Sequence, residues 1–169
     1  MAGNVGMTLL AIDGPAGAGK TTLAAKLEVE LSVNSTVKVI HMDDLYNGWV
    51  DALGPELTRV LQDITNAHLA GIECEIQLFN WHLMQFDRRE KITPTDYLIL
   101  EGVGAAQEVV RDAGATTYWL DIEPEIGLQR VLARDGSHIE QQMRQWQIDQ
   151  DKHFAEDQTR ENCEFKLTS

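Results

Sequence analysis

The sequence lacks the features that mark disulfide-rich, zinc-binding or nucleic-acid-binding proteins. It contains only two cysteines, Cys74 and Cys163, without C-x-x-C spacing, which predicts buried thiols instead of a zinc site or a disulfide framework. Basic residues are also scarce, because 14 Lys and Arg stand against 27 Asp and Glu and give a formal net charge of −13. Such a chain repels polyanions, so we expect no nucleic-acid partner and no acidic membrane surface.

Long apolar stretches are missing as well. The apolar segment Met7–Ile12 is too short for a membrane span or a signal-peptide core, and Met1–Gly6 before it contains no basic residue. We therefore expect a cytoplasmic protein that does not bind a membrane. The hydrophobic share of 43% and the charged share of 24% are typical of a globular chain. Because 169 residues is near the usual size of one domain, residues 1–169 are predicted to form a single domain.

Apolar residues follow two alternating patterns along the chain. Short continuous apolar runs predict buried strands, and apolar residues spaced by three or four predict helices. Glu73 and Glu75 make the third predicted strand more exposed, so we expect it nearer a sheet edge. The alternation predicts an α/β fold of three layers, with a mainly parallel sheet flanked by helices. Strands are predicted at 7–12, 37–41, 72–79, 97–100, 116–122 and 163–167, and helices at 20–31, 55–69, 124–134 and 139–159.

One glycine-rich segment carries a phosphate-binding pattern. The segment Gly14-Pro15-Ala16-Gly17-Ala18-Gly19-Lys20-Thr21 matches G-x-x-x-x-G-K-S/T and lies between a predicted strand and a predicted helix. Its glycines let backbone amides approach phosphate oxygens, and the helix directs the positive end of its dipole at the anion. Lys20 is expected on the terminal phosphates of ATP, and the Thr21 hydroxyl on Mg²⁺. The candidate ATP-binding residues are Gly14, Ala16, Gly17, Ala18, Gly19, Lys20, Thr21 and Thr22.

Carboxylates follow two of the other predicted strands. Ligands of open α/β sheets bind beyond the carboxyl ends of strands, so these side chains are candidates for the same site. Glu101 follows the apolar residues 98–100 and is placed to hold Mg²⁺ directly or through water. Asp43 and Asp44 follow the strand that ends at His41, where a carboxylate can accept a proton from an attacking hydroxyl. A loop-capping role is the alternative for Asp43.

Two arginines on a later predicted helix are candidates for stabilising a transferred phosphate. Arg130 and Arg134 are four residues apart and therefore lie on one helix face. Arginines in such a position contribute on the order of a thousandfold or more to the rate of phosphoryl transfer. The alternative is that they are surface residues paired with Asp121, Glu123 or Asp135.

Four segments together are more specific than the phosphate-binding pattern alone: residues 14–22, Met42–Tyr46, Leu98–Val103 and Arg130–Asp135. In this order they resemble P-loop small-molecule kinases of the uridine kinase, phosphoribulokinase and pantothenate kinase type, over most of the chain. The resemblance implies that Asp43, rather than Asp44, activates the acceptor hydroxyl. It also implies that Tyr46 lies near the substrate and that the arginine helix belongs to a lid over ATP. The candidate Mg²⁺ ligands are Thr21, Asp43 and Glu101.

The sequence departs from uridine kinases after the third predicted strand. Phe79-Asn80-Trp81 resembles the family's aromatic-Asp-aromatic segment, whose acid helps to hold a nucleoside sugar, but an asparagine stands at its centre. An amide bonds to a hydroxyl without the charge assistance of a carboxylate. Arg88 stands where uridine kinases have a substrate-contacting arginine, and Trp49 and Trp81 either stack on a base or pack in the core. The candidate substrate-binding residues are Asp44, Tyr46, Asn80, Trp81 and Arg88.

These patterns predict an ATP- and Mg²⁺-dependent kinase that phosphorylates a hydroxyl of a small metabolite. Its catalytic residues would be Lys20, Asp43, Arg130 and Arg134. The alternative is an ATP-binding regulatory or chaperone-like protein that hydrolyses ATP slowly and phosphorylates no acceptor. A GTPase and an ABC-type ATPase are disfavoured, because the sequence contains neither N-K-x-D nor L-S-G-G-Q. The sequence leaves the acceptor and the oligomeric state open.

Overall fold

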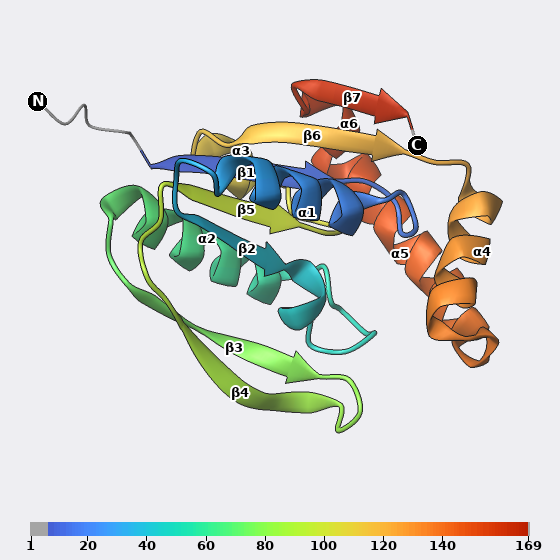
Figure 1. Cartoon of the computed structure of the whole chain (residues 1–169). Helices are drawn as coiled ribbons and strands as arrows, with labels where there is room; N and C mark the ends of the chain where they lie inside the picture. Colours follow the sequence, from blue (N-terminus) through green and yellow to red (C-terminus); the bar gives the residue numbers. More distant parts are fainter. Residues whose placement is uncertain (1–6, 169) are drawn as a thin grey trace, which may run out of the picture.

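A parallel sheet of five strands forms the centre of the computed structural model, which describes residues 7–168 (Figure 1). The strand order is β2-β5-β1-β6-β7, and every neighbouring pair is parallel. The predicted parallel sheet is therefore confirmed. Met1–Gly6, expected to lack an export signal, lie outside the described residues. The strands are β1 (Thr8–Asp13), β2 (Val37–His41), β5 (Tyr97–Glu101), β6 (Thr116–Asp121) and β7 (Phe165–Thr168).

Helices cover both faces of this sheet and complete the predicted three layers (Figure 1). One face is covered by α1 (Lys20–Leu31), and the other by α2 (Pro55–Ala70), α3 (Glu108–Asp112) and α5 (Glu140–Asp157). The arginine helix α4 (Pro124–Asp135) stands beyond the carboxyl end of β6. The shorter helical segments are η1 (Met42–Asp44) and η2 (Ser137–Ile139), both 3₁₀ helices, and α6 (Thr159–Asn162).

The residues of β1 show why both faces of the sheet are covered. Leu9 and Ala11 pack on one face with side chains of α2, α3 and α5, whereas Leu10 and Ile12 pack on the other face with Ala24 of α1. Successive side chains of a strand point to opposite faces, so a run that is apolar at every position needs cover on both sides. All four β1 side chains are at most 7% exposed.

The third predicted strand lies outside the main sheet. It forms β3 (Cys74–Asn80), which pairs in an antiparallel hairpin with β4 (Gln85–Ile92). We expected this strand at a sheet edge, and we predicted no strand at β4. The sequence of β4, QFDRREKI, is mostly charged and lacks the apolar pattern that identifies strands. One of these charged side chains, Arg89, forms an ion pair with Glu75 of β3 at 3.4 Å.

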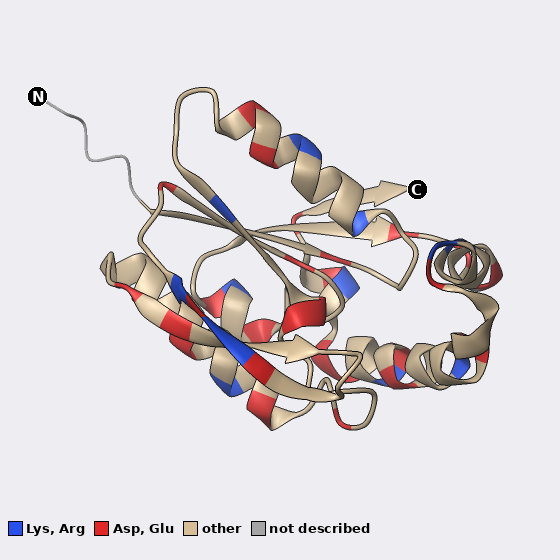
Figure 2. Ribbon diagram, turned by 60° about the horizontal axis from the view of Figure 1, so that its bottom comes forward, with Lys and Arg blue, Asp and Glu red and all other residues tan. Residues whose placement is uncertain are grey.

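Charged side chains are spread over the helices and the hairpin, with acidic residues in the majority (Figure 2). Within residues 7–168, no helix combines the length and the apolar composition needed to cross a bilayer. Both cysteines are free thiols, and only Cys163 is buried as expected. Cys74 is partly exposed because it begins the hairpin strand β3.

Candidate active site

The glycine-rich loop joins β1 to α1 and leaves the first turn of the helix open to a ligand. Gly17 and Gly19 have φ angles of 84° and 94°, in the left-handed region that glycine adopts without strain. The N–H of Leu23 donates to the carbonyl of Gly19 (3.1 Å), so the three preceding amides have no acceptor within the helix. A helix start of this kind binds phosphate oxygens.

The back of this loop lies directly against the backbone of α4. A Cβ atom on Gly17 would lie 2.3 Å from the carbonyl oxygen of Gly127, and a Cβ on Gly127 would lie 2.6 Å from the carbonyl oxygen of Ala16. Neither position therefore has room for a side chain. The sequence analysis missed Gly127, although a glycine inside a predicted helix is a sign of close backbone packing.

Lys20 is folded back over the loop that it follows. Its Nζ donates a hydrogen bond of 2.7 Å to the carbonyl of Pro15, and its side chain is buried. Burial lowers the pKa of Lys20, while the negative charges of Asp13 and Glu101 oppose that shift. A desolvated ammonium group in this position is suited to a polyanionic ligand. The negative charge of a phosphate would compensate for the water that the ammonium group loses on burial.

Glu101 connects the loop helix to the neighbouring strand β2. The Thr21 hydroxyl donates to the Glu101 carboxylate at 3.2 Å, and Nδ1 of His41 donates to Oε1 of Glu101 at 2.5 Å. This second bond is the main cause that raises the pKa of His41. His41 was not predicted as a site residue, but the parallel register pairs it directly with Glu101.

Asp43 lies on η1, immediately after β2, and its side chain opens into a cavity of about 680 Å³. The cavity walls remove much of its water, and this desolvation, followed by the charge of Glu101, raises the pKa of Asp43. Lys20 and Arg134 oppose the shift. Asp44 is not among the residues that line this cavity.

Asp13 is a buried carboxylate that connects two loops of the site. It accepts hydrogen bonds from the amides of Gly14 (2.7 Å), Gly104 (3.1 Å) and Ala106 (2.8 Å). Burial raises the pKa of Asp13 in spite of these donors. Asp13 was not predicted as a site residue, because the loop that supplies two of the donors is remote in sequence.

The two predicted arginines of α4 both line the cavity. Arg130 donates to the carbonyl of Gly17 at 3.3 Å, so it reaches the phosphate-binding loop. Arg134 forms an ion pair with Asp135 at 2.8 Å, as in the surface alternative, and this bond is the main cause that raises the pKa of Arg134. The structure therefore shows an acidic partner for Arg134 and places both arginines in the cavity lining.

A third helix also contacts the loop. The side-chain oxygen of Gln150, on α5, accepts a hydrogen bond of 3.1 Å from the amide of Ala16. Gln150 is only 3% exposed, which is unusual for an amide side chain on a polar helix. No sequence pattern predicts this contact, because it depends on how α5 packs against a loop that is 134 residues away in the chain.

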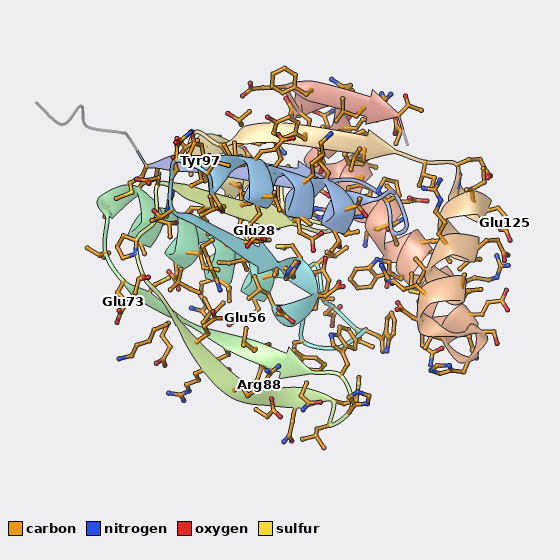
Figure 3. The ribbon with its side chains drawn as sticks, in the orientation of Figure 1. Glu28, Glu56, Glu73, Arg88, Tyr97 and Glu125 are labelled. Atoms are coloured by element: carbon orange, nitrogen blue, oxygen red, sulfur yellow. The ribbon has the colours of Figure 1, made fainter. Side chains whose placement is uncertain are left out.

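The predicted substrate residues divide into two groups. Tyr46 and Trp81 line the cavity, whereas Asp44, Asn80 and Arg88 do not. Asn80 stabilises the hairpin turn instead, since its Oδ1 accepts from the amides of His82 and Leu83 and its Nδ2 donates to Asp87. Arg88 lies on β4 in the hairpin, far from α4, where Glu125 is labelled (Figure 3).

A second and larger groove of about 960 Å³ lies between residues 49–54 and α5. Most of its lining residues come from α5, chiefly charged and amide side chains, and neither the phosphate-binding loop nor Asp43 contributes to it. It shares Trp49 and Trp146 with the smaller cavity. The groups capable of phosphate chemistry are therefore concentrated in the smaller cavity.

No protein-family model and no curated protein sequence matches this chain. Solved structures do match it, over nearly the whole length. A possible uridine kinase from Bacillus stearothermophilus has a TM-score of 0.71 and 18% identity, with 96% of this chain and 89% of that chain covered. A candidate fructose transport system kinase from a Silicibacter species has a TM-score of 0.72 and 16% identity, with coverage of 99% and 92%.

A more distant match is the shikimate kinase of Bacteroides thetaiotaomicron, with a TM-score of 0.52, 14% identity and coverage of 95% and 85%. At these identities the likeness establishes the fold. The chain has the fold of P-loop small-molecule kinases, as the resemblance of its four segments implied.

Proposed function

We propose that this protein transfers the γ-phosphoryl group of ATP to a hydroxyl group of a small metabolite, with the assistance of Mg²⁺. The observation that carries this proposal is that the phosphate-binding loop, the Asp43 carboxylate and two arginines line one cavity. A site of this composition can hold a triphosphate, a metal ion and an acceptor at once.

The loop amides and Lys20 would bind the β- and γ-phosphates of ATP. Thr21, Glu101 and Asp43 supply one hydroxyl and two carboxylates, which are oxygen ligands that suit Mg²⁺. Among residues 7–168, no three His, Cys, Asp or Glu side chains cluster to hold a metal by themselves, so the phosphates would complete the coordination. When bound, Mg²⁺ would neutralise charge on the phosphates.

Asp43 would orient the acceptor hydroxyl and take up its proton. In the transfer, the acceptor oxygen forms a bond to the γ-phosphorus, the bond from this phosphorus to the oxygen of ADP breaks, and the hydroxyl proton passes to Asp43. The raised pKa of Asp43 increases the affinity of its carboxylate for that proton. Arg130 and Arg134 would stabilise the negative charge that spreads over the transferred group.

Substitution of the loop lysine and the aspartate tests this assignment. Lys20→Ala should abolish turnover and weaken ATP binding, because it removes the ammonium group from the phosphates. Asp43→Asn should bind ATP normally but lower acceptor-dependent ADP release by about a hundredfold or more, since it removes the proton acceptor. Isothermal titration with Mg-ATP and an ADP-release assay across nucleosides, sugars and vitamin precursors provide the two measurements.

Asp44→Asn is the matched control, because it makes the same change one residue away and outside the cavity lining. Transfer at the unmutated rate by Asp43→Asn would show that the base is wrongly assigned. ADP release that is indifferent to every acceptor would favour the alternative, an ATP-binding regulatory or chaperone-like protein. A cytoplasmic location, where ATP is available, and a single domain over residues 1–169 are parts of the same proposal.

A further inference from the structure

The Lys and Arg side chains that line the cavity come from the phosphate-binding loop and α4, and none comes from the hairpin or from η1. Lys20 comes from the loop, and Arg130 and Arg134 come from α4. No other Lys or Arg of residues 7–168 lines the cavity. Arg88, which the sequence suggested for the substrate, lies on the hairpin with an exposed side chain and an Asp87 contact at 3.6 Å. The three cavity cations are the groups that a triphosphate and a transferred phosphoryl group would use.

The rest of the cavity has an aromatic wall, made by Tyr46, Trp49, Trp81 and Trp146. These residues come from the segment after η1, from the hairpin turn and from α5, so three distant parts of the chain build one surface. Their rings form a chain of contacts, with centroid distances of 4.9 Å from Tyr46 to Trp146, 6.2 Å from Trp146 to Trp49 and 5.1 Å from Trp49 to Trp81. Ring faces of this kind pack against sugars, bases and other apolar or cyclic groups.

Trp81 connects the aromatic wall to the proposed base. Its indole Nε1 donates a hydrogen bond of 2.9 Å to the backbone carbonyl of Asp43. A molecule that packs on Trp81 therefore lies beside the group that would receive its hydroxyl proton. The carboxylates of Asp43 and Glu101 make this part of the cavity negative, and the imidazoles of His82 and His138 are the basic side chains that line the cavity besides Lys20, Arg130 and Arg134. A negatively charged acceptor would meet repulsion from the two carboxylates, without a further Lys or Arg to offset it.

We propose that the acceptor is an alcohol without negative charge that binds through a ring packed on Trp49 and Trp81. Nucleosides and unphosphorylated sugars belong to this class, whereas carboxylate-bearing and phosphorylated alcohols do not. The inference rests on the proposed kinase function, because it identifies the acceptor of that same cavity. It separates acceptor classes that the common fold does not distinguish.

Binding can be measured without turnover. Tryptophan fluorescence of the full chain, with Mg-ADP present, should respond to at least one neutral member of matched pairs, such as a nucleoside and its 5′-monophosphate or a hexose and its 6-phosphate. We expect the charged member of that pair to bind about tenfold or more weakly, because like charges face each other. Equal or tighter binding of the charged members, or no binding by any neutral ring-bearing alcohol, would overturn the inference.

The same pairs are then tested for ADP release with ATP. A neutral alcohol that binds at the tryptophans but is never phosphorylated would refute the kinase function while leaving the acceptor class in place. A charged alcohol that is phosphorylated in preference to its neutral partner would refute the acceptor class while supporting the kinase. The two failures are therefore distinguishable.

Two substitutions of Trp49 separate stacking from space filling. Trp49→Leu should weaken acceptor binding about tenfold, whereas Trp49→Phe retains a ring and should restore most of the affinity. Binding of Mg-ATP, measured by calorimetry, should not change in either variant, since Trp49 is not part of the phosphate-binding loop. Equal acceptor binding by the Leu and Phe variants would contradict a stacking role.

A cation added to the acceptor side provides the complementary test. Met84 lines the cavity and is 50% exposed, while its neighbour Leu83 does not line the cavity and is 59% exposed. Met84→Lys should shift the preference toward the charged members by about tenfold relative to Leu83→Lys, which makes the same charge change outside the cavity. The same preference in both variants would show that charge at this wall does not select the acceptor.

Discussion

Single carboxylates connect segments of this protein that are remote in sequence. Glu101 contacts the hydroxyl of Thr21 on α1 and the imidazole of His41 on β2, so one side chain orders two sides of the candidate site. Asp13 does the same for the phosphate-binding loop and the loop after β5. Both are buried, so salt screens their interactions less than it screens those of surface charges.

The contact between Gln150 and the amide of Ala16 leads to a prediction at this scale. Gln150→Leu should lower the free energy of unfolding by about 1 kcal/mol, because it leaves the partly buried N–H of Ala16 without this acceptor. It should also weaken Mg-ATP binding, since the amide belongs to the phosphate-binding loop. Urea denaturation and calorimetry measure the two effects.

Gln147→Leu is the matched control, because Gln147 is on the same helix but only partly buried, and its side chain bonds to the carbonyl of Pro124 instead of the loop. Similar losses in both variants would indicate a general effect on α5. A Gln150→Leu protein that binds Mg-ATP normally would show that the loop keeps its shape without this acceptor.

Site residues differ in how far sequence reveals them. Lys20 and Thr21 follow from a local pattern, and Asp43 and Glu101 follow from their positions after apolar strands. His41 and Gln150 could not be found in this way, because their partners are fixed by strand register and by helix packing. Arg88 could not be placed without knowing that the chain turns back at residues 81–84.

At the scale of elements, the close contact between α4 and the phosphate-binding loop can be tested by adding a side chain at Gly127. Gly127→Ala should stabilise an isolated helix by roughly 1 kcal/mol. In this protein, however, the new Cβ would lie 2.6 Å from the carbonyl oxygen of Ala16, so the loop or the helix must move. We expect weaker Mg-ATP binding and a lower melting temperature, measured by calorimetry and circular dichroism. A more stable variant with normal ATP binding would contradict the reported contact.

The buried His68 on α2 leads to a prediction of how the stability of the protein depends on pH. Its Nε2 donates to the carbonyl of Thr8 at 2.9 Å, and burial lowers the pKa of His68 below its ordinary value of 6.5. The unfolded chain therefore binds more protons below pH 6.5, so this group reduces stability as the pH falls through that value toward the folded-state pKa.

Replacement by glutamine isolates this contribution, because His68→Gln keeps a donor but cannot titrate. The free energy of unfolding, measured in urea above and below pH 6.5, should fall less with acidity in His68→Gln than in the unmutated protein. Identical pH dependence in the two proteins would show that protonation of His68 is not coupled to folding.

Whether a segment forms a helix or a strand was more predictable than which strand it pairs with. The five strands of the main sheet and helices α1, α2, α4 and α5 were predicted within a few residues, because their apolar patterns are strong. Strand β4 was missed because five of its eight residues are charged, so its few apolar residues, such as Phe86 on Phe79, do not form a recognisable strand pattern. Pairing partners depend on tertiary contacts, which a local pattern does not encode.

For the whole molecule, ligand binding should appear as stability. A ligand that binds only the folded state at about 100 times its dissociation constant stabilises by about 2.7 kcal/mol. For a chain of this size, that corresponds to a rise in melting temperature of roughly 5–10 °C. Mg-ATP should produce this shift in the unmutated protein and a much smaller one in Lys20→Ala. Equal shifts in both would mean that the nucleotide binds elsewhere.

The contact of Gly17 with Gly127 also limits which substitutions the sequence of this protein can accept during evolution. Neither glycine is fixed by the G-x-x-x-x-G-K-S/T pattern, since Gly17 occupies one of its variable positions. Because both partners already have the smallest residue, a larger residue at one position cannot be compensated by a smaller one at the other. Random drift should therefore spare both positions together, and a saturation library selected for function should retain glycine at each.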